Sequence, residues 1–156
     1  MLQRADQLSG MNPLLSDPVL RLYGVMCVLL VFKMLAVGTY TSTIRLRRKV
    51  FATPEDYTNF GGAAPAGIDP DVERTRRAHQ NDLENVLPFM VVGLIYALTN
   101  PSLAAARLCF VGFFLARTLH SIFYIRALQP HRTIAFAVAE GLMIFMMVST
   151  LLSLVR

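Results

Sequence analysis

Ionisable side chains interrupt several long apolar stretches of this sequence. Lys33 and Glu140 lie inside the first and the last of these stretches, and Arg117 and His120 lie together in the third. Ionisable groups in such segments are costly and by default indicate a functional site. The alternative is a set of buried ion pairs that hold the helices together, for which Lys33–Glu140 and Glu84–Arg117 are the natural partners.

Helical spacing brings the polar residues onto two faces. One face carries them at offsets of 0, 4, 7 and 11 residues: Arg77, Asn81, Glu84 and Pro88. A second face carries them at offsets of 0, 3 and 7 residues: Arg117, His120 and Tyr124. Arginines outnumber carboxylates on these two faces. A guanidinium group recognises carboxylates through two parallel hydrogen bonds. For the cluster as a whole, the sequence favours a pocket for a small ligand with two carboxylates.

Composition indicates that the elements carrying these residues lie in a membrane. Hydrophobic residues make up 54% of the 156 residues and charged residues 16%, against about 25% charged in a soluble chain. This composition excludes a disordered protein and disfavours an ordinary soluble domain. The net charge is +5. The basic residues lie between the apolar runs, as in membrane proteins, and do not share a face with exposed aromatic residues, so we expect no nucleic-acid partner. Cys27 and Cys109 form neither a disulfide framework nor a CxxC pair, and no metal site is expected.

The fold class expected is all-α, an integral membrane four-helix bundle within a single domain, 1–156. The spans are predicted at about 18–45, 70–99, 101–126 and 130–155, with a loop at about 46–69. Each start carries a proline, which suits the first turn of a helix: Asp17-Pro18, Asp69-Pro70, Asn100-Pro101 and Gln129-Pro130. Thr53-Pro54 predicts a further short helix in the loop. A helix over 70–99 exceeds the bilayer thickness, so its first turns should project into water.

The distribution of basic residues predicts an orientation. The first loop and the projecting turns hold most of them: Arg45, Arg47, Arg48, Lys49, Arg74, Arg76 and Arg77. The positive-inside rule then places the first and third loops in the cytosol and both termini on the other side of the membrane.

Four stretches resemble the signatures of one family: residues 73–89 (ERTRRAHQNDLENVLPF), 44–57 (IRLRRKVFATPEDY), 115–124 (LARTLHSIFY) and 129–133 (QPHRT). The chain resembles the membrane-associated proteins in eicosanoid and glutathione metabolism (MAPEG) from about Leu22 onward. Within that family it is most similar to the microsomal glutathione transferase branch and next to the prostaglandin E synthase branch. The resemblance implies a homotrimer that holds glutathione between neighbouring subunits near the cytosolic side.

The resemblance also implies the site residues. Glutathione contacts are expected at Arg45, Arg77, Gln80, Asn81, Glu84, His120, Tyr124 and Arg132. The catalytic residues would be Arg132, which stabilises the glutathione thiolate, and Thr133, which donates a hydrogen bond to it. The synthase branch has arginine in place of Gln80 and serine in place of Thr133, and both differences favour the transferase.

The function expected is a membrane-bound glutathione transferase that conjugates glutathione, its co-substrate, to hydrophobic electrophiles and also reduces lipid hydroperoxides. The alternatives are a glutathione-dependent prostaglandin E synthase and a non-catalytic scaffold that binds lipid or a partner. The second substrate should arrive from the bilayer through a groove beside Phe123, Tyr124 and Phe136. The expected location is the endoplasmic reticulum membrane, or else the mitochondrial outer membrane, with the active site facing the cytosol.

Overall fold

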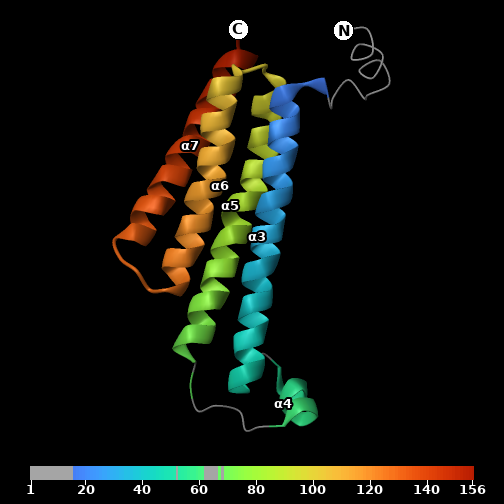
Figure 1. Cartoon of the computed structure of the whole chain (residues 1–156), viewed down its shortest axis with the longest axis vertical. Coiled ribbons are helices and arrows are strands. Elements are labelled where there is room, and N and C mark those ends of the chain that lie inside the picture. Colours follow the sequence, from blue (N-terminus) through green and yellow to red (C-terminus); the bar gives the residue numbers. More distant parts are fainter. Residues whose placement is uncertain (1–15, 52, 62–66, 68) are drawn as a thin grey trace, which may run out of the picture.

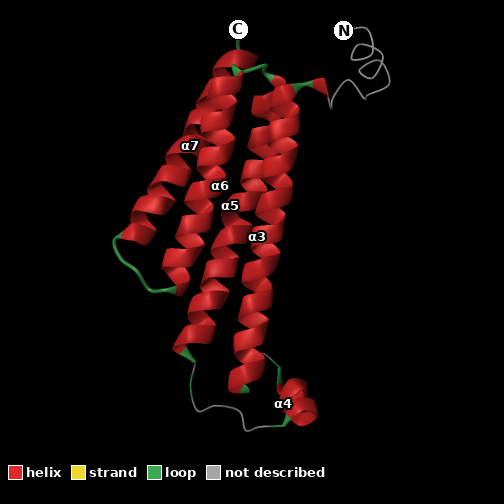
Figure 2. Ribbon diagram, viewed as in Figure 1, coloured by secondary structure: helices red, strands yellow, loops and turns green. Residues whose placement is uncertain are grey.

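A computed structural model describes residues 16–51, 53–61, 67 and 69–156 of the chain. The described residues form five helices and no strand: α3 (Pro18–Arg48), α4 (Pro54–Phe60), α5 (Pro70–Leu98), α6 (Leu103–Ile125) and α7 (His131–Leu154). The all-α class expected from the sequence is confirmed for this part of the chain, as is the short helix after Thr53 (Figure 2).

The long helices run side by side with alternating direction (Figure 1). The start of α3 and the C-terminus lie at one end, and the α3–α5 connection and the α6–α7 turn lie toward the other. The lower parts of α3 and α5 extend past the α6–α7 turn in this view. The end of α3 and the start of α5 are also tied together, because Arg48 pairs with Asp69 at 2.8 Å and with Asp71 at 2.5 Å.

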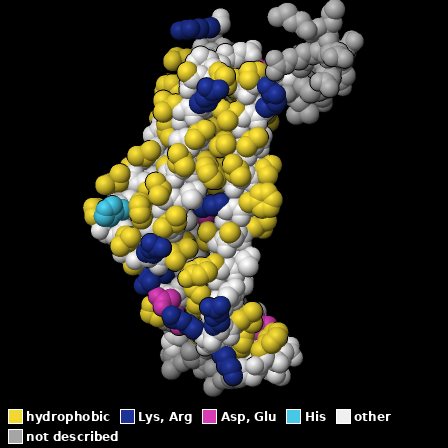
Figure 3. All heavy atoms as spheres, in the orientation of Figure 1, with side chains coloured by type: hydrophobic (Ala, Val, Ile, Leu, Met, Phe, Trp, Pro, Cys, Tyr) yellow, Lys and Arg dark blue, Asp and Glu magenta, His cyan; other side chains and the backbone are white. Residues whose placement is uncertain are grey.

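Three helices in the described part of the chain are long and apolar enough to cross a membrane: α3, α6 and α7. Helix α5 is 29 residues long, but its first two turns carry Asp71, Glu73 and three arginines. Hydrophobic side chains cover the middle of the molecule, and Lys and Arg side chains gather toward the lower end (Figure 3).

Side-chain caps fix the starts of the first two long helices as expected. The Asp17 carboxylate accepts hydrogen bonds from the backbone N–H groups at the start of α3, and that of Asp69 does so at the start of α5. Helix α6 starts differently, because Ser102 caps it and Asn100 takes a φ of 54° in the preceding turn. Asparagine tolerates this left-handed conformation, so Asn100 belongs to the turn rather than to the cap.

An aromatic core joins α3, α5 and α6. The rings of Phe89 and Phe113 stack with centroids 4.3 Å apart, and Phe110 meets Phe89 edge to face. Tyr23 packs against Phe110 and donates from its hydroxyl to the Met90 carbonyl oxygen at 2.5 Å. This core fixes α5 and α6 relative to each other, and both helices carry predicted site residues.

Candidate functional site

A polar hollow of about 440 Å³ lies where the start of α5 meets the end of α6 and the start of α7. It is lined by Pro70, Glu73, Arg74, Arg77, Tyr124 and Arg132. The structure therefore brings together three of the predicted glutathione contacts, from three different helices. With three arginines and one carboxylate in its wall, the hollow carries the excess of positive charge expected from the sequence.

Arg132 lies over the ring of Tyr124, with the guanidinium carbon 4.5 Å from the ring centroid. This is the distance of a cation–π contact, which orients the guanidinium group without using its N–H donors. Gln129 holds the same group from the other side. With its amide oxygen toward Arg132, it accepts from Nη2 at 2.5 Å and from Nε at 3.1 Å.

Thr133 does not line the polar hollow. It is exposed, and its hydroxyl lies 3.0 Å from the Gln129 side-chain amide. Gln129 thus contacts both predicted catalytic residues at the start of α7, which the sequence did not indicate.

Glu73 is the acidic member of the hollow. Its carboxylate accepts from Arg77 Nε at 2.8 Å and forms two further 2.8 Å hydrogen bonds with Arg76. These hydrogen bonds lower the pKa of Glu73 to about 2. The carboxylate therefore stays ionised at neutral pH and holds the guanidinium group of Arg77.

His120 is 3% exposed and does not line the hollow. Its ring centroid lies 5.6 Å from that of Tyr124 and 5.9 Å from that of Phe136. In the described part of the chain, His120 Nδ1 has no hydrogen-bond partner. The structure thus places His120 behind Tyr124, where it supports the wall of the hollow.

The remaining predicted contacts lie elsewhere in the chain. Arg45 lines a separate hollow of about 250 Å³ with Asp56 and Phe60, next to α4. Gln80 and Glu84 are exposed on α5 and bond to each other at 3.1 Å. Asn81 faces α6, where its side-chain oxygen accepts from Arg117 at 2.6 Å. Within a single chain, the predicted glutathione contacts are therefore not all in one place.

The ion pairs expected inside the bundle are wrong. Asp82 pairs with Lys33 and with Arg117, the latter at 3.0 Å, whereas Glu84 faces outward. Asp82, which was not among the predicted site residues, is completely buried. A signal was available, because Asp82 lies in a helical stripe of otherwise apolar buried residues that includes Ala78, Val86 and Phe89. A one-residue step from Asn81 turns the side chain into the bundle.

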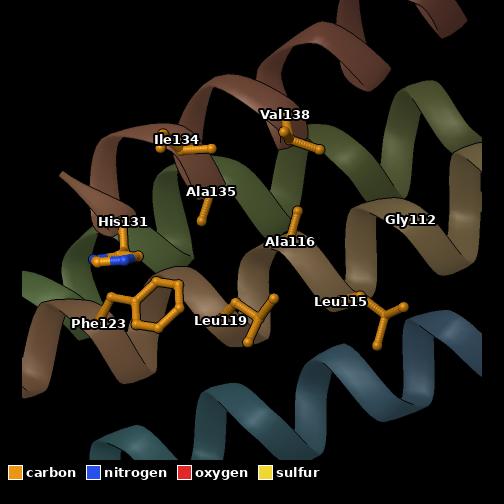
Figure 4. A pocket seen from close by; sticks show the side chains of 9 residues that line it. All are labelled: Gly112, Leu115, Ala116, Leu119, Phe123, His131, Ile134, Ala135 and Val138. Atoms are coloured by element: carbon orange, nitrogen blue, oxygen red, sulfur yellow. The ribbon is translucent and has the colours of Figure 1, made fainter. Parts of the chain in front are cut away.

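An apolar groove of about 290 Å³ lies between α6 and α7 (Figure 4). Its lining residues are Gly112, Leu115, Ala116, Leu119, Phe123, His131, Ile134, Ala135 and Val138. Phe123 and His131 lie together at one end, with ring centroids 5.5 Å apart. Of the three residues expected beside a groove, only Phe123 lines this one, because Tyr124 faces the polar hollow.

Comparisons with known proteins agree with this architecture. The MAPEG family profile matches residues 23–152. The prostaglandin E synthase of Bos taurus is 41% identical over 85% of this chain and 86% of its own length. The microsomal glutathione S-transferase 1 of Sus scrofa is 40% identical over 89% of this chain and 93% of its own length. The microsomal glutathione S-transferase 1 of Homo sapiens is 40% identical over 87% of this chain and 91% of its own length.

Proposed function

This chain belongs to the MAPEG family, and on that premise we propose that it is a membrane-bound glutathione transferase. It conjugates the thiolate of glutathione to hydrophobic electrophiles. The observation that carries the proposal is the polar hollow, where Arg77, Tyr124 and Arg132 converge from three helices. A hollow with three arginines and one acid suits the two carboxylates of glutathione.

The chemical task is to form a thiolate. A thiol with a pKa near 8.5 is mostly protonated at neutral pH, and only the thiolate attacks. One unit of pKa corresponds to about 1.4 kcal/mol, and a hydrogen bond from a charged donor contributes about 1.5–3 kcal/mol. Arg132 alone is therefore sufficient for a useful shift. With the Gln129 amide oxygen toward Arg132, its amide nitrogen donates to the Thr133 hydroxyl oxygen at 3.0 Å, so the Thr133 O–H is free to donate to the thiolate.

Assembly completes the site in this proposal. The chain forms a homotrimer, α5 is the fourth membrane span, and Arg45 reaches the polar hollow of a neighbouring subunit. The support is the outward position of Gln80 and Glu84 on α5, which an adjacent subunit would cover. The site faces the cytosol from the endoplasmic reticulum membrane.

The second substrate is apolar and enters from the bilayer. The groove between α6 and α7 supports this, because its wall is almost wholly apolar and it begins at Phe123, the neighbour of Tyr124 in the hollow. The same route would admit lipid hydroperoxides, for which we propose a glutathione-dependent peroxidase activity.

The test compares Arg132→Ala with Arg126→Ala in detergent-solubilised protein. Arg132→Ala should lower conjugation at least roughly tenfold, the loss expected for one charged hydrogen bond, and raise the apparent pKa of bound glutathione. Arg126 is exposed at the end of α6 and outside the hollow, so its variant should retain activity. Full turnover by Arg132→Ala would contradict the assignment of Arg132 as the residue that stabilises the thiolate.

A prostaglandin E synthase is the second candidate, because relatives of that name match this chain as closely as the transferases do. Assays with a chlorinated nitrobenzene and with a prostaglandin endoperoxide, run side by side, separate the two. Calorimetry with glutathione separates both from a non-catalytic scaffold, which would show no binding.

A further inference from the structure

One charged residue from each long helix lies in a common layer of the bundle. Lys33 of α3 bonds to the Asp82 carboxylate of α5, which also accepts from Arg117 of α6 at 3.0 Å. Ser121 adds hydrogen bonds of 3.1 and 3.2 Å to the two oxygens of Asp82. Asp82 is therefore the centre of a network that joins three helices.

Helix register places the fourth charge at the same level. Tyr124 contacts Arg132, and His120 contacts Phe136, across the antiparallel helices α6 and α7. One helical turn beyond this pair, moving away from the loop that joins α6 to α7, Arg117 lies on α6 and Glu140 lies on α7. The four charges alternate in sign and cancel, and Asp82 and Arg117 are fully buried. This layer therefore has no excess of positive charge with which to attract an anion.

The network also contacts Asn81, which lies about one helical turn after Arg77 on α5 and is a residue that the family resemblance assigns to glutathione. Arg117 Nη2 donates to the Asn81 side-chain oxygen at 2.6 Å and to its backbone oxygen at 3.0 Å. With its oxygen fixed in this way, the Asn81 amide has one orientation, and its Nδ2 donates no hydrogen bond to any described residue. That nitrogen is the donor left for a ligand carboxylate.

We infer that Asp82 is a positioning residue, which anchors Arg117 so that Arg117 holds the Asn81 amide ready for glutathione. The inference rests on the proposed function, because it assigns Asn81 to glutathione binding. Asp82 acts through two other side chains and never contacts the substrate.

The test is a double-mutant cycle between Asp82→Asn and Asn81→Ala, read by glutathione calorimetry and by steady-state kinetics. Asp82→Asn should weaken glutathione binding about fivefold to tenfold, the effect of losing one hydrogen bond to the ligand. At saturating glutathione, kcat should change less than about twofold, because the thiolate environment is intact. In the Asn81→Ala background, Asp82→Asn should cause no further loss.

Ser121→Ala is the matched control, because it removes a buried hydrogen bond to Asp82 and leaves the Arg117–Asn81 contact in place. It should not change glutathione affinity. If Asp82→Asn does not fold, Arg117→Met replaces it, because methionine has no donor and so removes the contacts that Arg117 Nη2 makes with both Asp82 and Asn81.

Two results would overturn the inference and leave the proposed function in place. In the first, wild type binds glutathione and Asp82→Asn binds it with the same affinity. In the second, the losses of glutathione affinity in the two single variants add fully in the double mutant. An equal loss in Ser121→Ala would have the same consequence, because it would indicate a general effect on the fold. Wild-type protein that binds no glutathione would instead overturn the proposed function, and the inference with it.

Discussion

Glu73 has two opposing effects at the scale of single residues. Its carboxylate bonds to Arg76 and Arg77, and so fixes Arg77 in the wall of the polar hollow. It also occupies Arg77 Nε, which is then not available to a ligand carboxylate, and it adds a negative charge to the wall. Glu73 therefore fixes Arg77 and competes with an anion for it.

Glu73→Gln should increase affinity for glutathione. The amide preserves the size of the side chain but removes the charge that repels an anion, and because the group is exposed the gain in affinity should be no more than about fivefold. Calorimetry measures the change. Glu55→Gln, on α4 and outside the hollow, is the control and should leave affinity unaltered. Weaker binding by Glu73→Gln would show that the carboxylate serves the ligand instead.

The same carboxylate should make stability depend on pH. Its pKa is about 2 in the folded chain against an ordinary value of 4.5. Because the folded pKa is the lower one, the stabilisation is present above pH 4.5 and is lost as pH falls from 4.5 toward 2. Apparent Tm in detergent should be higher for wild type than for Glu73→Gln at neutral pH, and the gap should close across this window. A gap that stays constant would contradict the assignment.

At the scale of elements, α5 presents different chemistry on neighbouring faces. Asn81 and Asp82 are adjacent in sequence, yet the first is only partly buried and the second is completely buried among apolar side chains. The aromatic core fixes the rotation of α5 that produces this arrangement. Gly93 lies against this core, and a Cβ atom there would lie 3.1 Å from Tyr23 Cε2 and 3.6 Å from Phe110 Cε1.

Gly93→Val should therefore destabilise the bundle. A branched side chain cannot fit without moving Tyr23, and such overpacking costs about 1–3 kcal/mol. Thermal unfolding in a fixed detergent measures the effect. Gly24→Ala is the control, since a Cβ atom there meets nothing within 4 Å and alanine favours a helix interior. Equal Tm values for Gly93→Val and wild type would show that α3 and α5 pack less closely than the structure indicates.

At the scale of the whole molecule, the predicted site residues lie in two separate places within one chain. Arg45 and Arg132 line different hollows, and large apolar side chains are exposed along the long helices. Lipid can cover many of these apolar side chains, but it cannot bring the two arginines together. A closed symmetric assembly can, because each subunit would supply Arg45 to the hollow of the next.

Mixing two inactive variants should then restore activity. Arg45→Ala and Arg132→Ala chains, co-expressed, would form intact sites wherever the former supplies Arg132 and the latter supplies Arg45. Random assembly gives about one site in four of this kind. Turnover of the purified mixed assembly measures the recovery, and the same variants purified separately and mixed in detergent provide the control. Activity no higher than that of the separate variants, in verified mixed oligomers, would place both arginines in one subunit's site or in none.

The sequence by itself determined the helices, most of their starts and the family, because apolar run length, X-Pro pairs and capping side chains are local signals. A helix converts spacing into position, so Arg74 and Arg77, which are three residues apart, both line the polar hollow. The sequence did not determine which charges pair. Glu84 and Asp82 are two residues apart and differ in direction, and only the packing of α5 against α3 and α6 decides which one meets Arg117. The separation of Arg45 from Arg132 was likewise decided by tertiary structure, because it depends on how helices distant in sequence lie against one another.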